Sequence, residues 1–188
     1  THNGWTPSVV AVIGNAEYTA TFTETPRIYT ITLNTNDGTI NAGNVTSYTY
    51  GVGATLPTNV TKENHQFDGW FDNSDCTGTA VTAISITDTG NKEYWAKWTE
   101  LPKYIVTWSA DGHSIKTEEV YVNEQVSVVP TISDIPEENR CGDKFVGWTT
   151  EAIPTPQDDA PGYFTTAANS PAITSDITFY AVFADYAD

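Results

Sequence analysis

One dipeptide, Gly-Trp, recurs along this chain and imposes a repeating organisation on it. The copies are Gly4-Trp5, Gly69-Trp70 and Gly147-Trp148, and the second and third belong to a longer motif, Phe-x-Gly-Trp, that begins at Phe67 and Phe145. After each tryptophan comes a segment that alternates aromatic or small residues with others: residues 18–22 (YTATF), 94–98 (YWAKW) and 179–183 (FYAVF). Self-similarity of this kind is the signature of a repeat architecture.

The alternating segments predict β-strands. With a period of two, two aromatic residues and one alanine fall on the same face, which suits a half-buried strand over a core. The second and third repeats also open with alternating segments, residues 29–33 and 104–108, each followed by an Asp-Gly pair at Asp37-Gly38 or Asp111-Gly112. Asp-Gly after an alternating strand favours a hairpin, because glycine adopts positive φ without steric cost.

These units set the expected boundaries. Residues 1–25 are the closing half of a truncated repeat, residues 26–101 form a full repeat, and residues 102–188 form a second one with a Pro-rich insertion at 150–175. Thr25-Pro26 and Leu101-Pro102 lie at the junctions, where proline stiffens a short linker and blocks strand continuation. Because Pro, Gly and β-branched residues interrupt every candidate helical window, we expect a mainly β chain of tandem small sheets, with at most one helical turn within residues 58–66.

The Gly-Trp tryptophans are expected to be core residues rather than exposed sugar-stacking platforms, because they recur in register with core-facing strands. The glycine before each of them permits a bulge or a close backbone approach. The predicted structural anchors of the repeats are Trp5, Phe67, Gly69, Trp70, Trp98, Phe145, Gly147, Trp148 and Phe183.

The charge of the chain excludes one class of partner. It has 24 acidic and 8 basic residues, a formal net charge of −16. Binding to nucleic acid requires clustered Lys and Arg, which eight scattered basic residues do not supply. Anionic membrane surfaces are disfavoured for the same reason, and no run of 18 apolar residues predicts membrane insertion.

Residues for catalysis or metal binding do not form a recognisable pattern. His2, His65 and His113 are dispersed, and the sequence has no zinc, nucleophile-elbow or Cys/His signature. We therefore expect no enzyme activity, no cofactor and no metal centre. Surface calcium bound by loop carboxylates such as Asp72, Asp75, Asp158 and Asp159 is the alternative.

The two cysteines, Cys76 and Cys141, lie far apart in the sequence, and no second Cys or His stands near either at metal-ligand spacing. Two unpaired thiols are the preferred interpretation, and a disulfide between them is the alternative.

A second group of residues is a candidate for ligand contact. Trp95 lies on the strand face opposite Tyr94, and Tyr180 holds the equivalent place in the third repeat. If exposed, both would contribute to a contact surface; burial under a loop or under the neighbouring repeat is the alternative. The insertion of the third repeat carries Asp158 and Asp159. Insertions in repeat arrays often form the binding face, but a solvated surface excursion is the preferred interpretation of this one.

The chain resembles the Listeria–Bacteroides repeat family, also known as the B repeats of internalin-type proteins. The resemblance is carried by the opening alternating strand, the Gly turn, Leu56-Pro57, Phe-x-Gly-Trp and the closing Tyr-x-Ala-x-Trp-Thr strand. It is strongest in residues 67–71 and 95–99, whereas the third repeat departs from it at Val122 and Asn123, where the family commonly has Tyr-Gly.

The resemblance implies small β-grasp-like modules in the extracellular part of a bacterial cell-surface protein. It implies a non-catalytic stalk, spacer or adhesive segment whose nearest partners are neighbouring repeats of the same chain. The alternatives are a module that binds a host glycan or protein, and an accessory domain of a secreted hydrolase.

Overall fold

The computed structural model describes the chain except for residues 12, 143, 153–158, 160 and 186–188. It is mainly β, with 44% strand and 5% helical residues, which confirms the predicted fold class. The β-grasp-like detail stays a prediction. The chain divides into two compact units, Thr1–Thr99 and Glu100–Asp188, and the division falls beside the Leu101-Pro102 junction.

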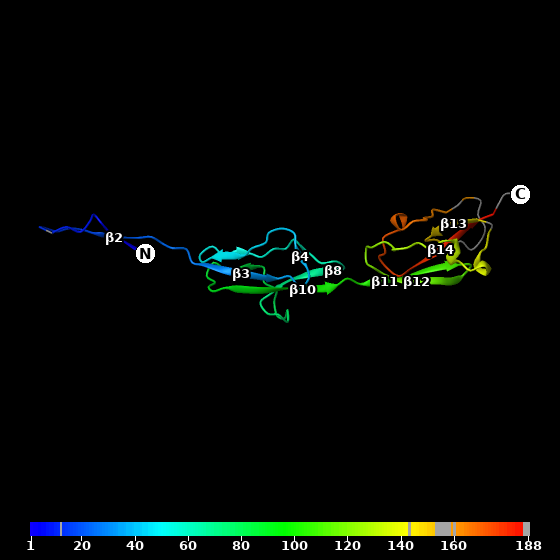
Figure 1. Ribbon diagram of the computed structural model, residues 1–188, viewed down its shortest axis with the longest axis horizontal. Coiled ribbons are helices and arrows are strands. Elements are labelled where there is room, and N and C mark those ends of the chain that lie inside the picture. Colours follow the sequence, from blue (N-terminus) through cyan, green and yellow to red (C-terminus); the bar gives the residue numbers. More distant parts are fainter. Residues whose placement is uncertain (12, 143, 153–158, 160, 186–188) are drawn as a thin grey trace. The chain divides into compact units, whose positions relative to one another are not determined.

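The first unit contains a short hairpin and the second repeat. In the hairpin, β1 (His2–Thr6) pairs antiparallel with β2 (Thr19–Phe22). The second repeat has a four-stranded sheet in the order β5-β3-β10-β8 (Figure 1). Its strands are β3 (Ile28–Asn34), β5 (Ser47–Thr49), β8 (His65–Phe71) and β10 (Lys92–Glu100). Two small ladders complete it, β4 (Thr39–Ile40) with β7 (Val60–Thr61) and β6 (Ala54–Thr55) with β9 (Ala83–Ile84).

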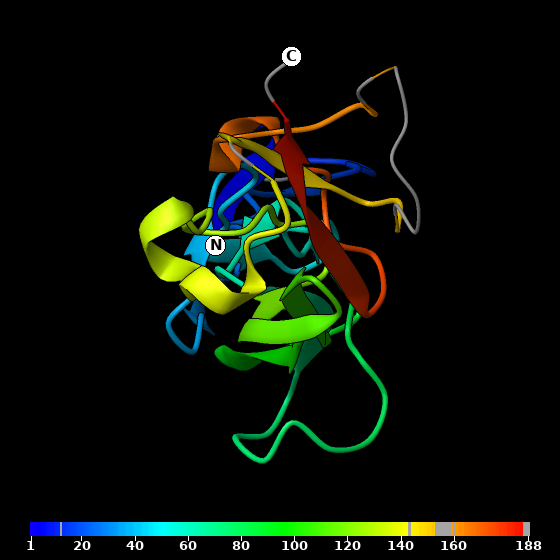
Figure 2. The ribbon, with the colours of Figure 1, turned by 90° about the vertical axis from the view of Figure 1, so that its right-hand side faces the viewer.

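The second unit is the third repeat, whose sheet has the order β12-β11-β14-β13. Its strands are β11 (Lys103–Ala110), β12 (His113–Tyr121), β13 (Lys144–Thr149) and β14 (Ile177–Ala184). Three 3-10 turns lie in its connections: η1 (Ile132–Asp134), η2 (Glu137–Asn139) and η3 (Ala167–Asn169). Figure 2 shows η1 and η2 as coiled ribbons, together with the green strands β11 and β12 and the red strand β14.

Both full repeats share one sheet topology. The opening strand and the closing strand are the two central strands, and they run parallel to each other, β3 beside β10 and β11 beside β14. The register aligns Ile31 with Lys92 in one repeat and Val106 with Ile177 in the other. A strand later in the chain pairs antiparallel with the opening strand at one edge of each sheet: β5 with β3, beyond the short β4, and β12 with β11.

Each repeat has its own hydrophobic core. The core of the second repeat includes Ile31, Leu56, Trp70, Tyr94 and Ala96, so the closing strand buries the face that alternation assigns to it. The core of the third repeat is more completely enclosed, and its largest side chains, which include Trp108, Trp148 and Phe179, have no exposed surface.

The glycine of the Gly-Trp motif is required by local geometry. Gly69 has a φ of +130°, and a Cβ there would lie 2.7 Å from Cβ of Ala80. At Gly147 the added atom would lie 2.7 Å from the carbonyl oxygen of Phe164, and the β13–β14 register shifts between Phe145 and Gly147. The predicted bulge and the predicted close approach are therefore both present in the third repeat.

Two local expectations are wrong. Asp37-Gly38 does not form a tight turn between adjacent strands: the turn residues are Asn36 and Asp37, and the chain enters β4, which pairs with β7, before β5 returns antiparallel to β3. Only at Asp111-Gly112 does the predicted pair connect adjacent strands directly, β11 and β12. Residues 58–66 form β7, a turn and the start of β8 rather than a helical turn, because ladder pairing to β4 holds this stretch extended.

Replacing Gly69 tests the close approach. We expect Gly69→Ala to destabilise the second repeat by about 1–3 kcal/mol more than Gly78→Ala, because both positions have positive φ but only Gly69 is crowded. Denaturant unfolding of the two variants measures the difference. Equal losses would show that the contact with Ala80 relaxes without cost.

Candidate functional site

The buried tryptophans of the two full repeats make the same interaction. Nε1 of Trp70 donates a hydrogen bond of 2.7 Å to the carbonyl oxygen of Pro57, and Nε1 of Trp148 donates one of the same length to Pro130. Trp70 is 2% exposed and Trp148 is 0% exposed, so each indole N–H is satisfied inside the core. The recurrence of Leu56-Pro57 and Val129-Pro130 before each motif is the sequence signal of this acceptor.

The backbone of each tryptophan also forms hydrogen bonds with the loop that follows the Gly-Trp motif. The carbonyl oxygen of Trp70 accepts a hydrogen bond of 2.7 Å from the N–H of Val81. Trp148 and Phe164 exchange two backbone hydrogen bonds of 2.9 Å. One residue therefore connects the closing half of the sheet, the proline segment and the loop that follows the motif.

The other predicted anchors surround these tryptophans. The Phe67 ring lies 5.6 Å from Trp70 and 5.1 Å from Trp98, centroid to centroid. In the third repeat Phe145 lies 5.7 Å from Trp148, and Phe183 takes the place of Trp98 at 5.6 Å from Phe145. These aromatic clusters are built for packing, since edge and tilted ring contacts add to buried area.

The prediction that Trp5 is a core residue is wrong. Trp5 is 48% exposed and its neighbour Phe22 on β2 is 68% exposed. The physical reason is that β1 and β2 form a two-stranded sheet by themselves, with the Trp5 ring against His2 at 5.7 Å. Within the described part of the chain, no proline carbonyl oxygen accepts a hydrogen bond from the Trp5 indole N–H, as Pro57 does for Trp70, and no third strand pairs with this hairpin.

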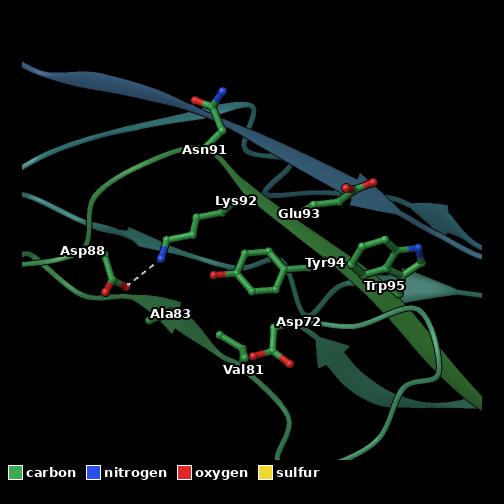
Figure 3. A pocket seen from close by; sticks show the side chains of 9 residues that line it. All are labelled: Asp72, Val81, Ala83, Asp88, Asn91, Lys92, Glu93, Tyr94 and Trp95. Atoms are coloured by element: carbon green, nitrogen blue, oxygen red, sulfur yellow. Dashed lines mark ion pairs between the residues drawn. The ribbon is translucent and has the colours of Figure 1, made fainter.

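Trp95 borders an open groove of about 540 Å³ on the second repeat (Figure 3). The groove is lined by side chains of β10, of the segment before it, and of the loop after the Gly-Trp motif. They are Asp72, Val81, Ala83, Asp88, Asn91, Lys92, Glu93, Tyr94 and Trp95. Trp95 is partly exposed, so the predicted contact residue is accessible to a ligand.

Tyr94 gives this groove its distinguishing group. Its side chain is 5% exposed, and its hydroxyl points toward Lys92 and Asp88, which form an ion pair of 3.9 Å (Figure 3). Burial, followed by the negative charge of Asp88, raises the pKa of Tyr94 above its ordinary value, so the hydroxyl stays protonated. Among the residues that the structure describes, this hydroxyl has no hydrogen-bond partner, and it is free to donate to a ligand.

Several polar groups of the groove are already engaged. Oδ1 of Asn91 accepts a hydrogen bond from the Thr30 N–H, and Oε1 of Glu93 accepts one from Nδ2 of Asn34. The third repeat does not reproduce the groove chemistry, because Phe179 stands where Tyr94 stands in the second. Tyr180, the counterpart of Trp95, is partly exposed.

The remaining predicted positions do not form a site with these. Asp159 is exposed, and Asp158 lies outside the described residues. Cys76 and Cys141 are both free thiols. In the described ranges, no group of three or more His, Cys, Asp and Glu side chains is placed to hold a metal ion, and no helix there is long and apolar enough to span a membrane.

Truncating the buried anchor tests its role. We expect Trp70→Ala to destabilise the second repeat by about 3–5 kcal/mol, because it leaves a large cavity and removes the donor to Pro57. The matched control is Trp5→Ala, which should leave that unfolding transition unchanged because Trp5 is exposed. Chemical denaturation followed by fluorescence compares the two. A loss below about 1 kcal/mol for Trp70→Ala would contradict the anchor role.

Comparison with known proteins agrees with this arrangement of two complete repeats. The model of the Listeria-Bacteroides repeat domain matches residues 29–97 and 104–182. No curated protein and no solved structure matches the chain. The family is typical of bacterial surface proteins and is generally non-catalytic. The two matched ranges cover most of the sequence, and the chain belongs to the Listeria-Bacteroides repeat domain family.

Proposed function

We propose that this chain is a non-catalytic structural and adhesive segment, a stalk or spacer, in the extracellular part of a bacterial cell-surface protein. One observation carries the proposal: two successive repeats each have a complete sheet and a separate buried core. Units that are complete in themselves can be added in series without rebuilding a common core.

The junction and the charge support the same role. β10 ends at Glu100 and β11 begins at Lys103, so only Leu101 and Pro102 separate the two sheets. A proline linker of this length restricts the backbone at the junction. The net charge of −16 makes neighbouring chains repel one another, which suits segments that stand close together on a surface.

A display experiment tests the spacer role. A small binding domain is shown on bacterial cells with this segment between the domain and the wall anchor, and capture of a large soluble ligand is measured. We expect capture to fall when residues 26–101 are deleted, because the binding domain is brought closer to the wall. A Gly/Ser linker of equal residue number is the control, since it adds chain without folded units. Capture that is unchanged by deletion of residues 26–101 would contradict the spacer role.

A second function is favoured by the groove beside Trp95. A partly exposed indole, an unpartnered phenol and flanking charged groups are the kinds of group that bind a neutral, polyhydroxylated ligand such as a host glycan. Here the Tyr94 hydroxyl would donate a hydrogen bond to the ligand, and Trp95, whose side chain lies on the other face of β10, would contact the ligand where it borders the groove.

A glycan and mucin array tests this second function. We expect saturable binding that is lost in Trp95→Ala and weakened about fivefold or more in Tyr94→Phe, the loss expected for one unmade hydrogen bond. Tyr94→Phe is a closely matched variant, because the third repeat carries phenylalanine at the same position. Binding that is absent from the whole array, or unaffected by both substitutions, would assign the segment to spacing alone.

A further inference from the structure

The central strand pair of each repeat is also the pair through which the chain enters and leaves that repeat. β3 is the first strand of the second repeat and β10 is its last, and the two are adjacent and parallel (Figure 1). The chain therefore enters at one end of this pair and exits at the other. β11 and β14 repeat the arrangement in the third repeat.

This geometry determines how a pulling force acts. When two parallel neighbours are pulled from opposite ends, the force runs along the strands and loads all hydrogen bonds between them together. When they are pulled from the same end, the bonds break one after another. Parallel bonds are evenly spaced along the pair, so the shear load is shared among them.

In the second repeat, side chains extend this hydrogen-bonded pair at both ends. Before the ladder, Oδ1 of Asn91 accepts a 3.1 Å hydrogen bond from the Thr30 N–H. Beyond it, Nδ2 of Asn36 donates to the Ala96 carbonyl oxygen at 2.7 Å. Nε1 of Trp98 donates to the Thr35 carbonyl oxygen at 2.8 Å. The opening and closing segments are thus bonded from residue 30 to residue 98.

In the third repeat one described side chain extends the parallel pair, but the residues of the pair are more completely buried. Oδ1 of Asp176 accepts a 2.8 Å hydrogen bond from the Ile105 N–H, the counterpart of the Asn91 contact. Val106, Trp108 and Phe179 are all 0% exposed, and the rings of Trp108 and Phe179 lie 5.0 Å apart across the pair. Excluding water matters here, because water that reaches a stretched hydrogen bond can replace it.

We infer that each full repeat is a mechanical clamp, in which the parallel β3–β10 or β11–β14 pair resists tension applied along the chain by shear. This function goes beyond the spacer role, since a spacer needs only length. The force that the clamp resists is tension between the two ends of the segment.

Single-molecule force spectroscopy of the full chain tests the clamp in the second repeat. Cys76→Ser and Cys141→Ser remove the native thiols, and exposed positions then receive the handles. Handles at Thr25→Cys and Pro102→Cys pull β3 and β10 from opposite ends. Handles at Thr25→Cys and Thr89→Cys pull the same pair from one end.

The expected result is a higher unfolding force in the first geometry than in the second, for the same folded repeat. Both variants are first checked for an unchanged thermal transition, so that a difference in force reports direction rather than folding. Equal forces, or a lower force between Thr25 and Pro102, would overturn the clamp.

A substitution provides a second, independent test. Trp98→Phe removes the bond to Thr35 and gives the second repeat the aromatic type that Phe183 provides in the third. At constant force in the shear geometry we expect unfolding to become roughly threefold to tenfold faster, the factor for one net hydrogen bond. Pulling from Thr25 and Thr89 should change little, because that geometry breaks the far end of the pair last. An equal acceleration in both geometries would indicate general destabilisation and would contradict the clamp.

Discussion

The hydrogen bond from a buried indole N–H to a proline carbonyl oxygen is the interaction on which each repeat depends. A buried donor without an acceptor costs on the order of 1–3 kcal/mol, so a core tryptophan must bring an acceptor with it. Pro57 and Pro130 provide that acceptor at 2.7 Å. The bond brings a non-strand segment over the sheet and closes the core on the side where the sheet itself offers no partner.

This interaction also sets the position of the central strands. The tryptophan lies on the strand that pairs with the closing strand, β8 beside β10 and β13 beside β14. That edge strand pairs with the closing strand, and the closing strand lies parallel to the opening strand. The groove at Tyr94 and the parallel pair therefore share one support, because both are built on β10.

The sequence predicted the buried tryptophans of the two full repeats and the buried face of the closing strand in the second repeat, because alternation with a period of two reports on which side chains face a core. Tyr94, Ala96, Trp70 and Trp148 are all buried. In the third repeat Val182, on the opposite face, is buried as well. The sequence failed for Trp5, because the same local pattern says nothing about whether a strand or proline segment covers it. It also missed that the Tyr94 hydroxyl has no hydrogen-bond partner among the described residues, because this depends on which groups of other segments lie near it. The turn at residues 36–37 differed since strand pairing elsewhere, between β4 and β7, overrides a local preference.

The loop that follows each Gly-Trp motif leaves from one tryptophan and returns to the same residue. In the second repeat it returns at Val81, and in the third at Phe164, which lies more residues beyond its tryptophan. Because loop-closure entropy grows only slowly with length, residues can be added here at small cost. The repeat thus separates a constant frame from a segment whose length and sequence can vary. That makes this loop a natural position for grafting a new recognition peptide onto the frame.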